Sequence, residues 1–196
     1  MTVRVYGDSI SGNCLKVKWT LEYLDIPYRW IETGVLQGET RTPDFLAMNP
    51  AGQVPTVVLS DGRALVQSNA IISHLAEGSA LIPQGAYERA KMMEWLFWEQ
   101  YSHEPYVAVA RFQVAYLGKS PAELDAKLVE RAHGALQRLE HALGGARFLV
   151  GDDCSLADVA LVAYTRVAHE GGLDLKLYPA VRAWVARVEA ALNITD

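Results

Sequence analysis

Two short segments of the chain carry residue types suited to binding a small peptide. Val54-Pro55 precedes an apolar run. A proline before a strand leaves the main chain of the preceding residue as an edge with which an extended peptide can pair. Gln67-Ser68 stands where a helix should begin, with Ser68 as its N-cap, and the free amides of a helix start suit a carboxylate. The two segments together predict a site for a short acidic peptide.

The elements around these residues form one pattern between Asn49 and Ile71. A glycine-containing loop leads into a strand at 57–59, Asp61-Gly62 gives a hairpin turn, and a return strand follows at 64–66. The order N-P-x-G-x-V-P, hairpin, Q-S-N-A-I resembles the glutathione-binding half of cytosolic glutathione transferases.

This resemblance implies roles for the matching residues. Val54, with Pro55 in the cis form, would pair through its main chain with the cysteinyl unit of glutathione. Gln67 and Ser68 would hold the γ-glutamyl carboxylate and amine, although many family members carry Glu where Gln67 stands. Arg41 and Gln53 are candidates for the glycine end of glutathione, and the alternative for Arg41 is a solvated surface side chain.

A third segment, Ser11-Gly12-Asn13-Cys14, stands at the start of the first helix and predicts thiol chemistry. A redox-active thioredoxin-like loop would carry C-x-x-C here, so serine at the first position excludes disulfide exchange by a vicinal cysteine pair. A serine can instead donate a hydrogen bond to a bound thiolate. Lowering a thiol pKa by about two units takes roughly 2.7 kcal/mol, which one charge-assisted hydrogen bond and the positive end of a helix can supply.

The spacing from Tyr6 to Ser11 is similar to that of serine-type transferases (theta- and phi-like), which indicates Ser11 as the catalytic residue. Ser9 is the alternative, and an ordinary helix cap is the structural interpretation of Ser11. Asn13 either contacts the glutathione thiolate or caps the helix.

The order of elements in residues 1–78 is β-α-β-α-β-β-α, which is typical of a thioredoxin-like α/β domain. A strand at 2–6, a helix and a strand at 28–32 predict a parallel pair with a right-handed crossover. The helix places Cys14 on its apolar face with Val17 and Leu21, which predicts a buried core thiol. Thr42-Pro43 opens a short helix through Met48.

After a linker at 79–85, residues 86–196 are predicted to form an all-α domain. The apolar stretch 87–117 should form a helix that Pro105 kinks or breaks. Its aromatic members are candidates for an electrophile pocket: Tyr106, Phe112 and Tyr116. A capping box at 120–123 should start the next helix, which Gly144-Gly145 ends.

A second capping box, Ser155 with Asp158, predicts a buried helix running to about His169. A last helix should span Tyr178-Pro179 to about Leu192. The G-D-x-x-S-x-A-D sequence around the box is similar to one in the helical domain of the same transferases. The resemblance therefore covers nearly the whole chain.

Composition limits the class of partner. The 196 residues carry a net charge of −5 without a basic cluster, which argues against nucleic acid and anionic membranes. Met1 to Tyr6 alternates like a strand rather than a secretory leader. Cys14 and Cys154 make neither a disulfide framework nor a metal signature, and the histidines show no ligand spacing. We therefore expect a cytoplasmic protein without a metal.

The resemblance predicts an enzyme that activates the thiol of glutathione, its co-substrate, for attack on a hydrophobic electrophile in detoxification. A homodimer is expected by the same resemblance. One alternative is a glutathione-binding or scaffold protein with little transferase activity. Another is a glutathione-dependent peroxidase, dehalogenase or isomerase.

Overall fold

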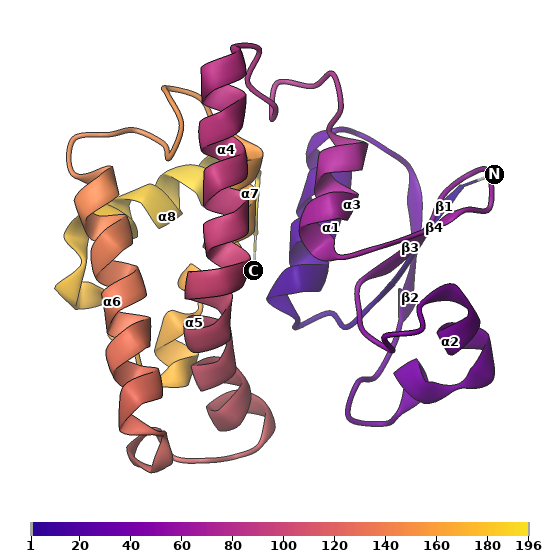
Figure 1. Cartoon of the computed structure of the whole chain (residues 1–196), viewed down its shortest axis with the longest axis horizontal. Helices are drawn as coiled ribbons and strands as arrows, with labels where there is room; N and C mark the ends of the chain where they lie inside the picture. Colours follow the sequence, from indigo (N-terminus) through magenta and orange to yellow (C-terminus); the bar gives the residue numbers. More distant parts are fainter. Residues whose placement is uncertain (1, 196) are drawn as a thin grey trace. The chain divides into compact units, whose positions relative to one another are not determined.

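The computed structural model describes residues 2–195, and the chain divides after Ser79 into two compact units. Figure 1 shows a unit that combines a sheet with helices and a unit made of helices alone. The fold is therefore a thioredoxin-like α/β domain followed by an all-α domain, as the sequence predicts. The expected domain limits at Met1 and Asp196 lie outside the described residues.

The sheet of the first unit contains four strands in the order β2-β1-β3-β4. β1 (Val3–Gly7) is parallel to β2 (Tyr28–Glu32) and antiparallel to β3 (Thr56–Val58), which pairs antiparallel with β4 (Ala64–Val66). The predicted parallel pair is confirmed, and α1 (Gly12–Tyr23) makes the crossover.

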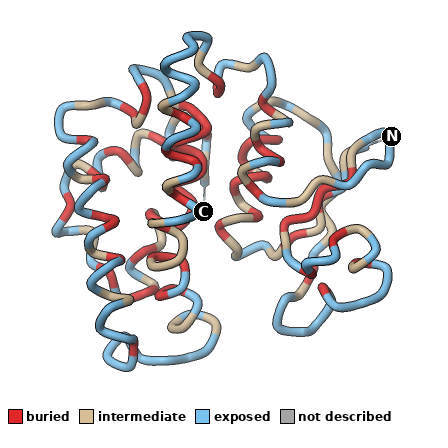
Figure 2. The backbone as a smooth tube through the Cα atoms, viewed as in Figure 1, coloured by how far each residue is buried: buried red, intermediate tan, exposed pale blue. Residues whose placement is uncertain are grey.

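Two helices of the first unit, α1 and α3 (Ser68–Leu75), lie side by side on one side of the sheet (Figure 1). Their core includes the fully buried apolar side chains of Val17, Leu21 and Ile71. Cys14 is fully buried with them, as predicted. Figure 2 shows the buried positions of this unit concentrated in the strands and in the α1–α3 pair. The start of each helix, where the candidate residues stand, is thus fixed by a packed core.

A short helix, α2 (Pro43–Met48), follows a 3₁₀ turn, η1 (Glu39–Arg41). The hydroxyl of Thr42 accepts a hydrogen bond from the N–H of Phe45, so Thr42 is the N-cap and Pro43 takes the first helical position, as predicted. α2 orients the loop that follows it, because the Asn49 N–H donates to the Phe45 carbonyl at its last turn.

The first helical stretch of the second unit is divided into four segments. α4 (Ala86–Trp98) runs into a π-helical turn, η2 (Glu99–His103), and α5 (Glu104–Arg111) runs into a second one, η3 (Phe112–Tyr116). Pro105 lies in the first turn of α5, where its missing N–H costs no helical hydrogen bond. The predicted break therefore takes the form of a π-turn that ends just before the proline.

The capping box at 120–123 is present, but it caps a 3₁₀ turn, η4 (Pro121–Glu123), rather than the helix after it. That helix, α6 (Ala126–Leu143), begins instead at Asp125, whose carboxylate accepts from the N–H groups of Lys127 and Leu128. The sequence prediction was wrong here because two N-cap residues five positions apart each begin a turn.

The helix that the second capping box begins is α7 (Leu156–Thr165), and all ten of its residues are buried. It ends before the predicted limit at His169, where a 3₁₀ turn follows, η5 (Ala168–Gly171). A further turn, η6 (Leu175–Leu177), leads into α8 (Pro179–Ala191).

Within residues 2–195, no helix combines the length and the hydrophobicity needed to cross a bilayer.

Candidate active site

The loop before β3 presents an open main-chain edge. The Val54–Pro55 peptide is cis, and the turn is held by Asn49, a buried residue whose side-chain amide donates to the Gln53 carbonyl at 2.7 Å and to the Thr56 hydroxyl at 3.1 Å. Among the described residues, the N–H and C=O of Val54 have no hydrogen-bond partner. An extended peptide can therefore pair with Val54 as one more strand would.

The start of α3 has an unusual backbone. Gln67, not Ser68, is the N-cap, which corrects the sequence prediction by one residue. Its φ of 69° and ψ of 111° fall in a backbone region that residues other than glycine rarely adopt. Strain of this kind concentrates at ligand sites because the surrounding structure must enforce it. Gln67 is exposed, whereas Ser68 is buried at the first helical position.

The beginnings of α1 and α3 meet at Asn13. The amide oxygen Oδ1 of Asn13 accepts a hydrogen bond from Ser68 Oγ at 2.8 Å and a second from Lys16 Nζ at 2.8 Å. Lys16 is fully buried, which is rare for a lysine. Sequence reasoning missed Lys16, because a lysine in a helix is usually solvated.

Ser11 is the N-cap of α1, but its side chain makes no capping hydrogen bond. Instead the Ser11 hydroxyl hydrogen-bonds the sulfur of Cys14, and the N–H of Asp8 lies 3.4 Å from the same atom. Ser11 therefore stands at the N-cap, as its structural interpretation predicts, but its side chain does not cap the helix. In the folded protein the hydroxyl of Ser11 interacts with the sulfur atom of Cys14 instead.

Ser9, the alternative to Ser11, is engaged with a carboxylate. Its N–H donates to Glu32 Oε1 at 2.9 Å, and its hydroxyl also hydrogen-bonds Glu32. Partial burial acts to raise the pKa of Glu32, but the hydrogen bonds from Trp30 and from Ser9 together lower it below its usual range. Using the Ser9 hydroxyl on a thiolate would break a charge-assisted hydrogen bond, which favours Ser11.

The remaining candidates of the first unit lie on the loop that carries Val54. The guanidinium of Arg41 donates to the Ala51 carbonyl at 3.3 Å, two residues before Gln53. Both Arg41 and Gln53 are exposed. Gly52 between them has a φ of 62° and packs against Arg41 and the Thr40 carbonyl, so a side chain there would be strained and crowded.

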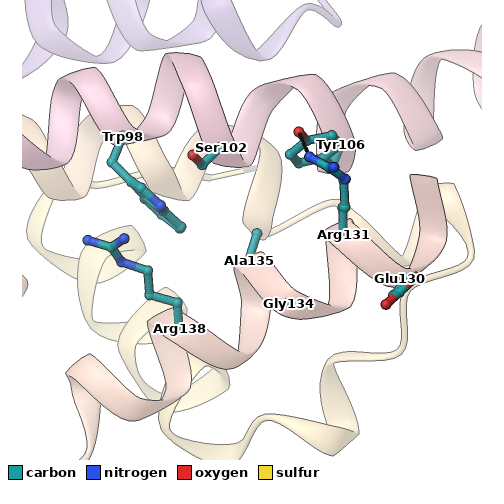
Figure 3. A pocket seen from close by; sticks show the side chains of 8 residues that line it. All are labelled: Trp98, Ser102, Tyr106, Glu130, Arg131, Gly134, Ala135 and Arg138. Atoms are coloured by element: carbon teal, nitrogen blue, oxygen red, sulfur yellow. Dashed lines mark hydrogen bonds between the residues drawn. The ribbon is translucent and has the colours of Figure 1, made fainter. Parts of the chain in front are cut away.

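In the second unit, Tyr106 lines a hollow of about 350 Å³ between α4, η2 and α5 on one side and α6 on the other (Figure 3). Its hydroxyl accepts from Arg131 at 2.8 Å, and Arg138 lies over the Trp98 ring. The other two predicted electrophile contacts are not among the residues that line this hollow. These two, Phe112 and Tyr116, lie against one another in η3, with ring centres 5.0 Å apart and ring planes tilted by 31°.

Within residues 2–195, no group of three or more His, Cys, Asp or Glu side chains has an arrangement that could hold a metal ion.

Comparison with known proteins gives one consistent result. Residues 10–77 match the glutathione S-transferase N-terminal domain, and residues 91–191 match the glutathione S-transferase C-terminal domain. The chain belongs to the glutathione S-transferase family. A glutathione S-transferase structure from Pseudomonas fluorescens is 46% identical, with a TM-score of 0.93, and covers 97% of this chain and 96% of that one.

Curated relatives agree on the family but differ in activity by name. Glutathione S-transferase 3 of Zea mays is 30% identical over 96% of this chain and 89% of that protein. A relative from Escherichia coli, 28% identical over 89% of this chain and 85% of that protein, is named disulfide-bond oxidoreductase YfcG. More distant chains that share the fold include Ure2p in complex with glutathione, at 22% identity and a TM-score of 0.85.

Both thiols of this transferase should react slowly while it is folded. Burial raises the pKa of Cys14 to about 12 despite hydrogen bonds from Ser11 and Asp8, and burial likewise raises that of Cys154. At pH 8 the thiolate fraction of Cys14 is then about a thousandfold below that of a free cysteine. We expect a disulfide reagent to label the native protein at least a hundredfold more slowly than the unfolded protein.

A Cys154→Ser variant isolates Cys14, and rapid labelling of that folded variant would contradict the burial of Cys14.

The raised pKa of Cys14 also makes the free energy of unfolding depend on pH. Since an unfolded cysteine ionises first, the contribution of Cys14 to folding is complete below the unfolded pKa and is lost as the pH rises toward about 12.

Proposed function

We propose that this glutathione transferase lowers the thiol pKa of bound glutathione through the hydroxyl of Ser11 and directs the thiolate to a hydrophobic electrophile. The observation that carries the proposal is that the Ser11 hydroxyl, at the start of α1, makes no helix cap and is hydrogen-bonded to a sulfur. The thiol of glutathione would take the place of the Cys14 sulfur as its partner. The positive end of α1 adds to the stabilisation of a thiolate there.

The rest of the site supports binding of the tripeptide. The open main chain of Val54, next to the cis Pro55, offers the pairing edge for the cysteinyl unit. The N-terminus of α3 offers main-chain N–H groups for the γ-glutamyl carboxylate, and Gln67 and Ser68 stand at that end. Arg41 and Gln53, on the Val54 loop, would reach the glycine carboxylate. Catalysis then consists of thiol activation and proximity, and no step needs a metal.

The finer features of the proposal follow from the family resemblance. They are a hydrophobic electrophile in contact with Tyr106, Phe112 and Tyr116, a homodimer, a cytoplasmic location and a role in detoxification. Light scattering at micromolar concentration tests the dimer, and a monomer would contradict it.

A second candidate is reduction of small disulfides, which the name of the Escherichia coli relative favours. A Ser11-stabilised glutathione thiolate would attack one sulfur of the substrate and break its S–S bond, and the leaving thiolate would take a proton. A second glutathione would then release glutathione disulfide and the other thiol. Since Cys14 is buried with a raised pKa, both attacking thiolates come from glutathione.

The deciding experiment follows thiolate absorbance at about 240 nm against pH as glutathione is added to the protein. We expect the bound thiol to ionise about two pH units below free glutathione. Turnover of an aryl halide against turnover of a small disulfide then separates the two reactions. Binding without a pKa shift would indicate a glutathione-binding protein with little transferase activity, and no binding would overturn the proposal.

A further inference from the structure

The buried Lys16 is unexplained by the core of the first unit, because every other fully buried side chain around it on α1 is apolar or a short polar group. An ammonium group is stable away from water only when its N–H donors are satisfied. Asn13, one helical turn before Lys16, supplies one acceptor through Oδ1 at 2.8 Å. The same oxygen accepts from Ser68 Oγ at 2.8 Å.

The donor and acceptor capacities of the Lys16 ammonium, the Asn13 amide and the Ser68 hydroxyl determine how these groups are oriented. A hydroxyl both donates and accepts, so Ser68 alone would tolerate either orientation of the Asn13 amide. A lysine ammonium only donates, so it requires the amide oxygen to face it. Lys16 therefore decides which way the Asn13 amide points, and the Ser68 hydroxyl must then give its proton to Asn13.

We propose that Lys16 is a positioning residue of the glutathione site, which sets the Asn13 amide and through it the Ser68 side chain at the start of α3. The inference rests on the proposed function, since Ser68 is there a ligand for the γ-glutamyl end. With its hydroxyl proton given to Asn13, Ser68 presents its main-chain N–H and a hydroxyl oxygen to the ligand. Both are then fixed before glutathione arrives, which lowers the entropy cost of binding.

Replacing Lys16 by methionine keeps the aliphatic stem and removes the donor. We expect the Kd for glutathione, measured by titration calorimetry on the full chain, to rise about tenfold in Lys16→Met. The KM for glutathione should rise with it while kcat changes less than threefold, because Ser11 is untouched. Lys16→Arg keeps a donor at this place and should recover most of the affinity. Lys18→Met, two residues along the same helix and half-buried, is the matched control and should bind as wild type.

A double-mutant cycle with Asn13 separates positioning from a general loss of structure. If Lys16 acts through Asn13, Lys16→Met should weaken binding in the wild type but change the Kd less than twofold in an Asn13→Ala background. Equal effects in both backgrounds, or wild-type affinity in Lys16→Met, would overturn the inference. Should Lys16→Met fail to fold, the same cycle is run with Lys16→Gln, and Lys16→Arg remains the variant that should recover most of the affinity.

The outcomes also distinguish this inference from the proposed function. If wild-type protein fails to bind glutathione, the proposed function fails before the variants are compared. If wild-type protein binds and activates glutathione while Lys16→Met matches it, the function stands and only the role of Lys16 is lost.

Discussion

Replacing Ser11 by alanine is expected to return the pKa of bound glutathione to about its free value, a rise of roughly two units. The thiolate loses its hydrogen-bond donor and keeps only the helix end, while the nearby carboxylates of Asp8 and Glu32 act against ionisation of a sulfur at this place. At pH 7 the thiolate fraction and kcat/KM should fall about 25-fold. Above about pH 9 the variant should approach the wild type, because the free thiol ionises without help.

Ser9→Ala is the matched control for this experiment. Its hydroxyl hydrogen-bonds Glu32, so its removal should leave the pH profile of kcat/KM unchanged within half a unit. If Ser9→Ala shifts the profile and Ser11→Ala does not, the assignment of the catalytic serine is reversed. An equal loss of rate at every pH in Ser11→Ala would mean that Ser11 affects geometry rather than ionisation.

The largest effect on stability is expected at Asp158, which is fully buried in the second unit. Its carboxylate accepts from the Ser155 N–H and hydroxyl, the Leu149 N–H and the Trp184 indole N–H, at 2.8 to 3.0 Å. Burial raises the pKa of Asp158, and these donors oppose the rise. Asp158→Ala leaves these donors without their acceptor, on the buried Ser155 and Trp184 and the half-buried Leu149. We expect a loss of about 3–5 kcal/mol in the unfolding free energy.

Guanidinium unfolding followed by tryptophan fluorescence measures this loss, since Trp184 is among the residues affected. Asp153→Ala, an exposed acidic neighbour in the same loop, should change the unfolding free energy by less than about 0.5 kcal/mol. A loss under about 1 kcal/mol in Asp158→Ala would show that the four contacts do not hold the start of α7.

The family and the element types could be predicted from the sequence because they depend on local residue order. The hairpin after Val54, the parallel β1–β2 pair and the box at Ser155 each follow from short-range spacing, and each is present in the structure. Element ends were less predictable. α6 starts at Asp125 rather than at the box of Ser120, since both offer an acceptor to free helix amides.

In the candidate site, too, the sequence predicts some features and leaves others to the tertiary structure. Ser11, Val54 and Gln67 are suggested by motif, but their contacts are not. The Ser11 hydroxyl contacts Cys14, and the Ser9 hydroxyl contacts Glu32. Both contacts depend on β1, α1 and β2 lying together. Asn49 holds the Val54 turn but had no predicted role, although it begins the motif. Its partners are the Gln53 carbonyl and the Thr56 hydroxyl, and the residue types alone do not reveal this pairing.

The sequence by itself determined the family, the order of elements and which loops carry the proposed thiol site, because local propensity and residue spacing encode these. Only the tertiary structure decided that Lys16 is buried and that its ammonium shares the Asn13 oxygen with Ser68, 55 residues away in the sequence. The physical reason is that helical periodicity gives the face of a side chain, whereas its burial and partner depend on the packing of α1 against α3.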